Sequence, residues 1–255
     1  MKLRIATYNV RKAVGLDWRR DPMRIARVLS GIGADIVLLQ EADKRLGARP
    51  AALDAAAVAA TGLHALDVSE DGPSLGWHGN AVLARSGIAL GRIDRVVLPA
   101  LEPRGALAML LEADGVPLRV AALHFGLLRA SRRRQKSAVL AALDGLGDAP
   151  MMMGGDFNER TLWRLTDMER AGLRSITPGP SFHAARPVLA LDHFVVGPGV
   201  TVLRSGVVTD GEARRASDHL PVWMDVEIGV PVDQSVGVKS EGATASYLAV
   251  FRSEQ

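Results

Sequence analysis

Two patterns of apolar residues near the start of the chain predict strands. Apolar and polar positions alternate over residues 3–8, which predicts a short strand ending at Asn9. Residues 35–40 form an almost continuous apolar run, which is typical of a strand covered on both faces, and Glu41 follows at its C-terminal end. Polar side chains therefore stand where each of these two strands leaves the core.

Helical spacing appears between and after these strands. Asp21 suits a helix N-cap, Pro22 suits the first turn, and apolar residues then recur three and four positions apart until Gly33, which should end the helix. The same reasoning predicts further helices over residues 50–61, 131–146 and 159–171.

The rest of the chain consists of short apolar runs separated by glycine and proline. Strands are predicted at residues 80–85, 88–98, 105–112, 118–124, 150–154, 191–196, 200–208 and 222–228. Those between residues 64 and 124 are expected to form an antiparallel meander. We predict one domain over residues 1–229, because strands and helices interleave without a linker. Residues 230–255 form a C-terminal tail, either loosely attached or carrying a last strand near residues 245–251.

Composition narrows the classes of protein and of site. Of 255 residues, 48% are hydrophobic, which excludes a disordered chain, and none is cysteine, which excludes disulfides and thiolate metal sites. The formal net charge of +3 does not by itself demand an anionic partner. No apolar stretch approaches the roughly 20 residues of a membrane-spanning helix. The first residues also lack a secretory apolar block, so a cytoplasmic protein is expected.

Five polar clusters stand at predicted strand ends and carry the candidate chemistry. They are residues 8–9, residues 40–41, His124, residues 154–158, and Asp192 together with residues 217–219. Carboxylate and amide oxygens with two imidazoles suit Mg²⁺ or Mn²⁺ and make a structural zinc site a poor fit. We therefore predict a hard-cation site formed by residues far apart in the sequence.

Six short motifs, in order, resemble the endonuclease/exonuclease/phosphatase superfamily of deoxyribonuclease-I-like hydrolases. They are T-Y-N-V at residues 7–10, L-L-Q-E at 38–41, G-N-A-V-L-A-R at 79–85, G-D-F-N at 155–158, L-D-H at 191–193 and S-D-H-L-P-V at 217–222. The resemblance implies an α+β fold, a four-layer α/β/β/α sandwich of two packed mixed sheets flanked by helices. It also implies divalent-metal-dependent cleavage of phosphate esters at one end of the sandwich.

The resemblance assigns metal ligands. Glu41 would be the main ligand, with Asn9 beside it, and Asp218 would face the metal or the phosphate. A Mg²⁺ ion that keeps several waters needs only one or two protein carboxylates, which agrees with this set. Adjacent residues of a strand point to opposite faces, so Asp218 and His219 can share a site only from a loop before the strand at 222–228.

The resemblance also assigns catalytic residues. Asp156 and Asn158 would orient the attacking water and donate to phosphoryl oxygens, and both would face the same side if the backbone stays extended. His219 is the candidate general base, with Asp192 orienting its ring. His124 would contact the phosphate or act as an acid.

Two further residues are candidates for substrate binding. Asn80 stands where some nucleases of the family carry a glutamate, a departure that weighs against their two-histidine mechanism. Arg104 suits a phosphate clamp or, equally, a solvated loop. The basic residues of 129–136 either hold an anionic substrate or lipid headgroup or form the solvated side of a helix. The remaining histidines, at positions 64, 78, 183 and 193, are expected to lie outside the site.

These expectations define a magnesium-dependent hydrolase, with Mn²⁺ as the alternative cation, that cleaves a phosphodiester or phosphomonoester by in-line attack of water. The favoured substrate is a phospholipid or sphingolipid headgroup or a small phosphodiester, with contact at a membrane surface left open. A DNA or RNA nuclease is the alternative, although aromatic residues, at 4%, offer few platforms for base stacking. A non-catalytic binding module is the third interpretation. The sequence specifies no oligomeric state.

Overall fold

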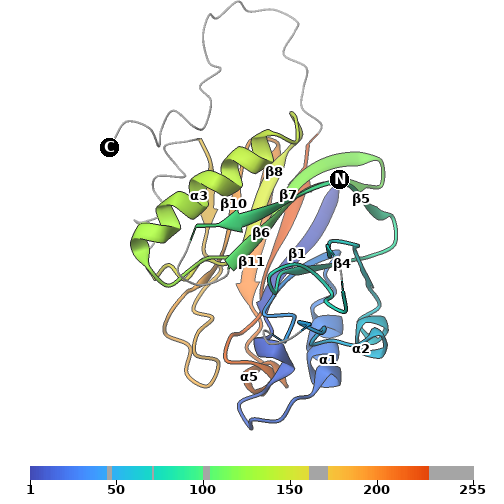
Figure 1. The fold of residues 1–255 in the computed structure, drawn as a ribbon, viewed down its shortest axis with the longest axis vertical. Coiled ribbons are helices and arrows are strands. Elements are labelled where there is room, and N and C mark those ends of the chain that lie inside the picture. Colours follow the sequence, from blue (N-terminus) through green and yellow to red (C-terminus); the bar gives the residue numbers. More distant parts are fainter. Residues whose placement is uncertain (45–47, 71, 100–103, 161–171, 230–255) are drawn as a thin grey trace, which may run out of the picture.

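Two six-stranded sheets pack face to face in this protein (Figure 1). The computed structural model describes residues 1–44, 48–70, 72–99, 104–160 and 172–229. The first sheet has the order β11-β12-β1-β2-β4-β3 and the second the order β5-β6-β7-β8-β10-β9. Both mix parallel and antiparallel pairs, since β1 runs parallel to β2 and β7 runs parallel to β8.

The strands and helices have the following bounds. The first sheet contains β1 (Lys2–Asn9), β2 (Ile36–Gln40), β3 (His64–Ala65), β4 (Ala81–Ala84), β11 (Val200–Val207) and β12 (Val222–Ile228). The second contains β5 (Ile88–Leu98), β6 (Arg104–Ala113), β7 (Val116–His124), β8 (Met151–Asp156), β9 (Arg174–Ile176) and β10 (Asp192–Val196). The helical segments are η1 (Arg11–Ala13), α1 (Pro22–Ile32), α2 (Ala55–Ala60), α3 (Arg129–Asp144) and α5 (Ala213–Ala216).

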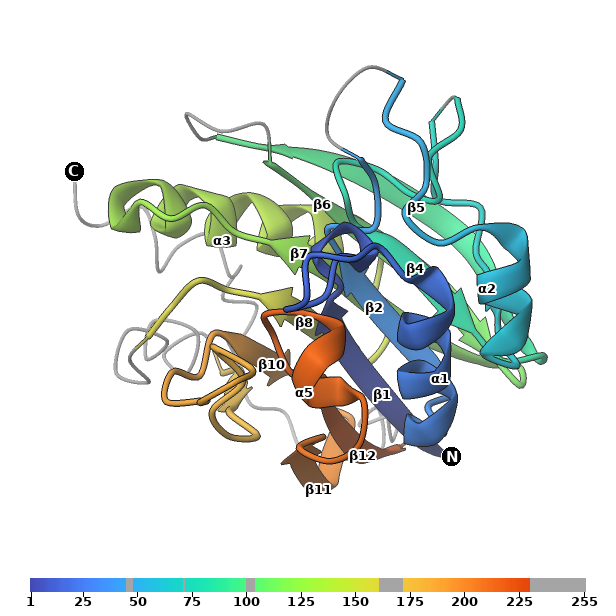
Figure 2. The same ribbon diagram turned by 90° about the horizontal axis from the view of Figure 1, so that it is seen from below.

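Helices cover the outer face of each sheet and complete four layers. Figures 1 and 2 show α3 on one side of the paired sheets and α1 with α2 on the opposite side. The inner strand β2 shows why its apolar run is continuous. Ile36 and Leu38 belong to the core between the sheets, whereas Val37 and Leu39 pack in the core beneath α1 and α2. The predicted α/β/β/α sandwich is therefore confirmed.

Two helix starts are set by aspartate caps. Asp21 accepts a 2.9 Å hydrogen bond from the backbone N–H of Arg24, and Gly33 ends α1 with a φ of 62°, as predicted. The helix predicted over residues 50–61 is shorter than expected. It begins only after Asp54, which accepts a 2.8 Å bond from the N–H of Ala57. Alanine richness indicated the helix but not its first residue.

The expected meander is only partly correct. Strands β5, β6 and β7 do form successive antiparallel pairs, but β4 belongs to the other sheet, where it pairs with β2. Apart from its first two residues, the helix predicted at 159–171 lies outside the described residues. The tail at 230–255, with its predicted strand near 245–251, also lies outside them. None of the described helices is long and apolar enough to cross a membrane.

Candidate active site

Strand pairing brings the predicted site residues to one edge of the sandwich. Asn9 lies opposite Gln40 in the parallel pair β1–β2, and His124 lies opposite Asp156 in the parallel pair β7–β8. Because β10 runs antiparallel to β8, its first residue, Asp192, lies opposite Asp156. The two sheets thus contribute polar side chains to the same end of the molecule.

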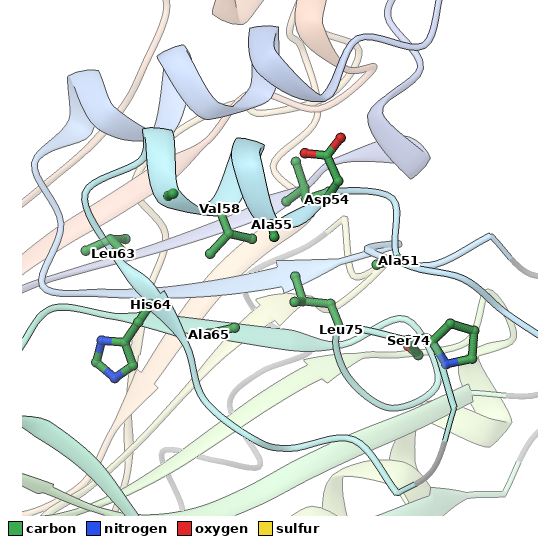
Figure 3. Close-up of a pocket in the computed structure, with 12 residues that line it drawn as sticks. Ala51, Asp54, Ala55, Val58, Leu63, His64, Ala65, Ser74 and Leu75 are labelled. Carbon is green, nitrogen blue, oxygen red and sulfur yellow. The ribbon is translucent and has the colours of Figure 1, made fainter.

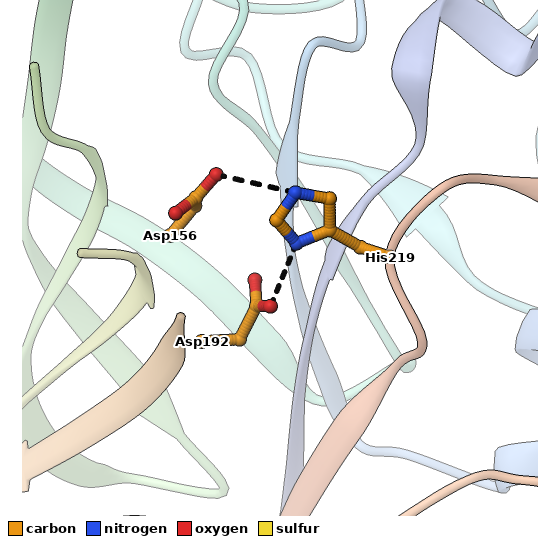
Figure 4. A group of neighbouring side chains, drawn as sticks. All are labelled: Asp156, Asp192 and His219. Atoms are coloured by element: carbon orange, nitrogen blue, oxygen red, sulfur yellow. Dashed lines mark hydrogen bonds and ion pairs between the residues drawn. The ribbon is translucent and has the colours of Figure 1, made fainter. Parts of the chain in front are cut away.

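Asp156, Asp192 and His219 form the centre of this site (Figure 4). Nδ1 of His219 lies 2.8 Å from Oδ2 of Asp192, and Nε2 lies 3.7 Å from Oδ2 of Asp156. All three residues are buried, and one ligand atom from each lies within 4.8 Å of the others. His219 and Asp218 stand in the loop before β12, the position that sequence reasoning predicted for them.

One carboxylate oxygen of Asp192 is hydrogen-bonded by neighbouring residues, and the other has no hydrogen-bond partner among the described residues. Its Oδ2 accepts a 2.6 Å hydrogen bond from the hydroxyl of Ser181, in addition to its contact with His219. Its Oδ1 is buried and has no hydrogen-bond partner within the described part of the chain. Buried polar atoms are usually hydrogen-bonded, so this oxygen is an acceptor left available at the site.

Asp156 connects the two sheets. Its Oδ2 accepts a 3.1 Å hydrogen bond from the side-chain amide of Asn9 on β1 and lies 3.3 Å from Nε2 of His124 on β7. The preceding residue, Gly155, allows β7 and β8 to approach, because a Cβ there would lie 1.9 Å from the carbonyl oxygen of Leu123. Glycine before Asp156 therefore fixes the position of the carboxylate.

Burial and mutual charge shift the pKa values of this centre. Burial raises the pKa of Asp156 to about 6, although the nearby His219 opposes the shift. Burial alone would lower the pKa of His219, but the carboxylates of Asp192 and Asp156 outweigh it and raise the pKa to about 10. The chain's own charges thus favour the imidazolium form of His219 at neutral pH.

Asn158 reaches the site by a turn rather than along an extended strand. Its φ is 49°, its N–H donates 2.9 Å to Oδ1 of Asp156, and its side-chain amide donates 2.9 Å to the carbonyl of Phe125. The assumption that Asp156 and Asn158 share a side through an extended backbone was wrong. The turn instead holds Asn158 beside the end of β7.

The predicted metal ligands contact cationic side chains that sequence reasoning missed. Glu41, with a φ of 52°, forms an ion pair with Nζ of Lys12. Oδ2 of Asp218 lies 3.6 Å from Nε of Arg11 and its Oδ1 lies 3.3 Å from the hydroxyl of Ser217. Asn9 was expected beside Glu41, and its amide nitrogen is directed to Asp156. The consecutive basic residues Arg11 and Lys12, close after Asn9 in the sequence, were the one signal that could have indicated these contacts.

The two predicted substrate-binding residues occupy different environments. Arg104 is buried, and its NH1 nitrogen lies 2.9 Å from both ring nitrogens of His124, so it does not belong to a solvated loop. Asn80 is fully buried and donates 2.8 Å to the carbonyl of Gly105. Its Oδ1 has no hydrogen-bond partner among the residues that the structure describes.

The basic segment at the start of α3 divides into two parts. Arg132 and Lys136 are buried, and Arg132 binds the carboxylate of Glu159 at 3.3 Å and the carbonyl of Gly126 at 3.2 Å. Arg129 and Arg133 are exposed. The interpretation of this face as purely solvated was therefore wrong for the two buried residues, one of which fixes the loop after β7.

The other four histidines, which were expected to lie outside the site, are not part of the buried group of Asp156, Asp192 and His219. His193 is buried among Thr177, at 2.8 Å from Nδ1, and the carbonyl oxygens of Glu159 and Ala190. A separate cavity of about 460 Å³ lies between α2, β3 and residues 73–75, with a mainly apolar lining (Figure 3). None of the candidate site residues lines this cavity.

The side chains at the site fit a hard divalent cation. Glu41, Asp218 and Asn9 offer carboxylate and amide oxygens, the donor type that Mg²⁺ and Mn²⁺ prefer. Glu41 and Asp218 each contact a cationic side chain of the same chain, Lys12 and Arg11 respectively. The group that could itself hold an ion in the described residues is Asp156, Asp192 and His219.

Comparisons with solved structures agree with the fold. An endonuclease/exonuclease/phosphatase from Beutenbergia cavernae DSM 12333 is 24% identical, with a TM-score of 0.66, covering 89% of this chain and 72% of that one. A mannosyl-6-phosphatase from Bacteroides thetaiotaomicron VPI-5482 is 20% identical, with a TM-score of 0.68 and coverage of 89% and 100%. TDP2 from D. rerio, complexed with a single strand DNA product, is 19% identical, with a TM-score of 0.65 and coverage of 89% and 99%.

Sequence comparison adds the family. A search of curated proteins found no match to this chain. The model of the endonuclease/exonuclease/phosphatase family matches residues 6–219, which include every catalytic, metal and substrate candidate named above. The chain therefore belongs to the endonuclease/exonuclease/phosphatase family.

Proposed function

We propose that this protein is a divalent-metal-dependent phosphoesterase that hydrolyses a phosphodiester by in-line attack of water. The observation that carries the proposal is the meeting of Asp156, Asp192 and His219 in one buried group, with Asn9 and His124 in contact with Asp156. Buried titratable groups with perturbed pKa values at the end of a sheet are typical of an active site.

Mg²⁺, or Mn²⁺ as the alternative, would be held by Glu41 with Asn9 and Asp218 nearby. When bound, the ion supplies Lewis-acid polarisation of a phosphoryl oxygen. Asn9 also donates to Asp156, so the same residue links the metal side of the site to the catalytic carboxylate. In this proposal, the metal ligand Asn9 and the catalytic carboxylate of Asp156 are joined by one hydrogen bond.

Asp156, Asp192 and His219 handle the proton. Asp192 fixes the ring of His219 through Nδ1 and favours its protonated form. A protonated His219 cannot accept a proton. His219 therefore acts as the general base only when positive charge offsets the carboxylates around it and lowers the pKa of its ring. Asp156, with its pKa raised to about 6, is the neighbouring carboxylate that orients the water.

His124, Asn158 and Arg104 serve the phosphoryl group. Arg104 borders the ring of His124, and the guanidinium fork matches the geometry of phosphate oxygens. Asn158 is held by the carbonyl of Phe125 at the end of the same strand. The positive and amide groups on this side of Asp156 would stabilise the negative charge that develops on the phosphoryl group during attack.

The substrate we favour is a phospholipid or sphingolipid headgroup or a small phosphodiester. Leu127 and Leu128 follow His124 by three and four positions and expose 62% and 54% of their surface. Exposed leucines beside a phosphate site suit a substrate that carries an apolar portion. Neighbouring arginines at positions 129 and 133 are exposed on the first turns of α3.

A nuclease is the second candidate, favoured by the structural likeness to a TDP2 complexed with a single strand DNA product. One exposed aromatic ring stands near the site, because Trp18 is 79% exposed and its ring lies 4.7 Å from the guanidinium carbon of Arg11. That ring offers a surface on which a base could stack.

A substrate panel tests the proposal. Plasmid DNA, RNA, phospholipid vesicles, small phosphate monoesters and bis-p-nitrophenyl phosphate are assayed with Mg²⁺, with Mn²⁺ and with a chelator. We expect metal-dependent turnover that His219→Ala and Asp156→Ala abolish. Turnover of vesicles or small diesters above DNA supports the favoured substrate, and the reverse order supports the nuclease. Absence of turnover with either metal contradicts an enzyme and leaves the binding module.

A further inference from the structure

Two consecutive cationic residues each contact one of the acidic residues that we assign to the metal. Lys12 Nζ pairs with Oε2 of Glu41, and Nε of Arg11 lies 3.6 Å from Oδ2 of Asp218. The side chains involved are only partly exposed, at 28% and 16% for Lys12 and Glu41 and at 22% and 26% for Arg11 and Asp218. Both carboxylates therefore have a positive partner from one short segment.

The backbone of this segment is built to hold that arrangement. Arg11, Lys12 and Ala13 have φ values of 46°, 59° and 58°, a left-handed turn that non-glycine residues rarely adopt. Hydrogen bonds fix the turn on both sides. The N–H of Lys12 donates 3.0 Å to the carbonyl of Glu41, and the N–H of Asp21 donates 2.8 Å to the carbonyl of Ala13.

Lys12 thus touches residue 41 twice, through its backbone N–H and through its ammonium group. A flexible lysine on an open surface gains little from an ion pair, because it must order a long side chain. Here the backbone contact places the start of the side chain beside its partner, so less freedom is lost when the pair forms.

We infer that the Arg11–Lys12 turn is a built-in cation that occupies the metal ligands Glu41 and Asp218 until a divalent ion displaces it. The inference rests on the proposed function, since it takes these residues as metal ligands. A divalent ion and an ammonium group repel each other at one carboxylate, so the ion must move Lys12 away to bind. Lys12 therefore weakens metal binding and sets the concentration at which the site fills.

The displaced ammonium group remains at the mouth of the site. Lys12 is anchored by its backbone to residue 41, so its side chain can move only within its own length. A phosphate oxygen of an incoming substrate is the anionic group of matching charge within that reach.

Mn²⁺ titration at pH 7.5, followed by the electron paramagnetic resonance signal of the free ion, tests this inference without any turnover. We expect Lys12→Met to bind Mn²⁺ about two- to fivefold more tightly than the unmodified chain, given the strength of partly exposed charge pairs. Lys12→Arg keeps the charge and should bind as the unmodified chain does. Melting temperatures in a chelator check that each variant is folded.

Arg19→Met provides a matched control, since it removes one positive charge from an exposed position in the same loop. Equal affinity in Lys12→Met and Arg19→Met overturns the inference, because the effect would then be one of net charge. Failure of the proposed site looks different. In that case Glu41→Gln binds Mn²⁺ as tightly as the unmodified chain, and the assignment of Glu41 as a ligand falls with the inference.

Discussion

Nδ1 of His219 lies 2.8 Å from Oδ2 of Asp192, and this contact joins the two sheets at the site. His219 comes from the loop before β12 in the first sheet, whereas Asp192 is the first residue of β10 in the second. Both residues are buried, so water screens the pair weakly. The contact therefore bears on both the chemistry of the site and the stability of the fold.

Replacing Asp192 with asparagine should reduce catalysis strongly. The amide keeps the size of the side chain but removes the charge that orients His219 and stabilises its imidazolium form, so we expect kcat to fall by about 10²–10⁴ with a smaller change in KM. The rate of hydrolysis of bis-p-nitrophenyl phosphate with Mg²⁺ measures both kcat and KM. Asp67→Asn, at an exposed position, is the control and should leave kcat unchanged. An unchanged kcat in Asp192→Asn would contradict the role of Asp192.

Stability should fall as the pH rises above neutrality. The pKa of His219 is raised from 6.5 to about 10, so the stabilisation by its imidazolium is fully present below pH 6.5 and is lost as the pH approaches 10. Asp156, whose pKa is raised to about 6, gains its proton at a lower pH than the range in which His219 loses its proton. Urea unfolding in a chelator between pH 7 and 10 measures the slope, at most about 1.4 kcal/mol per pH unit from one group.

The same titration in His219→Gln separates this residue from the rest of the chain. The variant should lose the part of the slope that His219 contributes, whereas His64→Gln, at an exposed position of β3, should keep it. Identical slopes in His219→Gln and the unmodified chain would show that His219 is not held as an imidazolium.

Adding a methyl group at position 155 should unfold the site. A Cβ there would lie 1.9 Å from the backbone oxygen of Leu123, which cannot move aside without separating β7 from β8. We expect Gly155→Ala to lower the free energy of unfolding by more than about 3 kcal/mol, measured by chemical denaturation. Gly31→Ala in α1 meets nothing within 4 Å and should raise stability by about 0.5–1 kcal/mol. A stable Gly155→Ala would show that the strands are less closely packed than described.

Arg104 should affect substrate binding more than folding. Its guanidinium lies beside the ring of His124, so Arg104→Gln removes a charge from the phosphate side of the site. We expect kcat/KM for a phosphodiester to fall about 10- to 100-fold, from the loss of one charge-assisted contact. Arg92→Gln on the exposed part of β5 is the control. Equal kinetics in the two variants would place Arg104 outside the substrate site.

The positions of the site residues were predictable because they stand at strand ends. The apolar run of β2 ends at Gln40 and the alternation of β1 ends at Asn9, so local pattern alone located two of the polar clusters. The family motifs then supplied the partners from distant segments. Pairing in the structure brings His124, Asp156 and Asp192 to the same edge, in agreement with that expectation.

Other features depend on long-range packing that a local pattern does not encode. The choice of sheet for β4 depends on its pairing with β2, and the short segment itself is equally apolar on both faces. Burial of Arg132 depends on Glu159, a residue 27 positions later. The left-handed turn at Lys12 contradicts the usual preference of that residue, so only the structure revealed its contact with Glu41.

The placement of β12 between β11 and β1 gives the site a fixed order of assembly. During translation, Asn9 and Glu41 leave the ribosome early, whereas His219 and β12 follow some two hundred residues later. The first strand therefore waits for β12, and the contact of His219 with Asp192 forms only after both the early and the late segments are present.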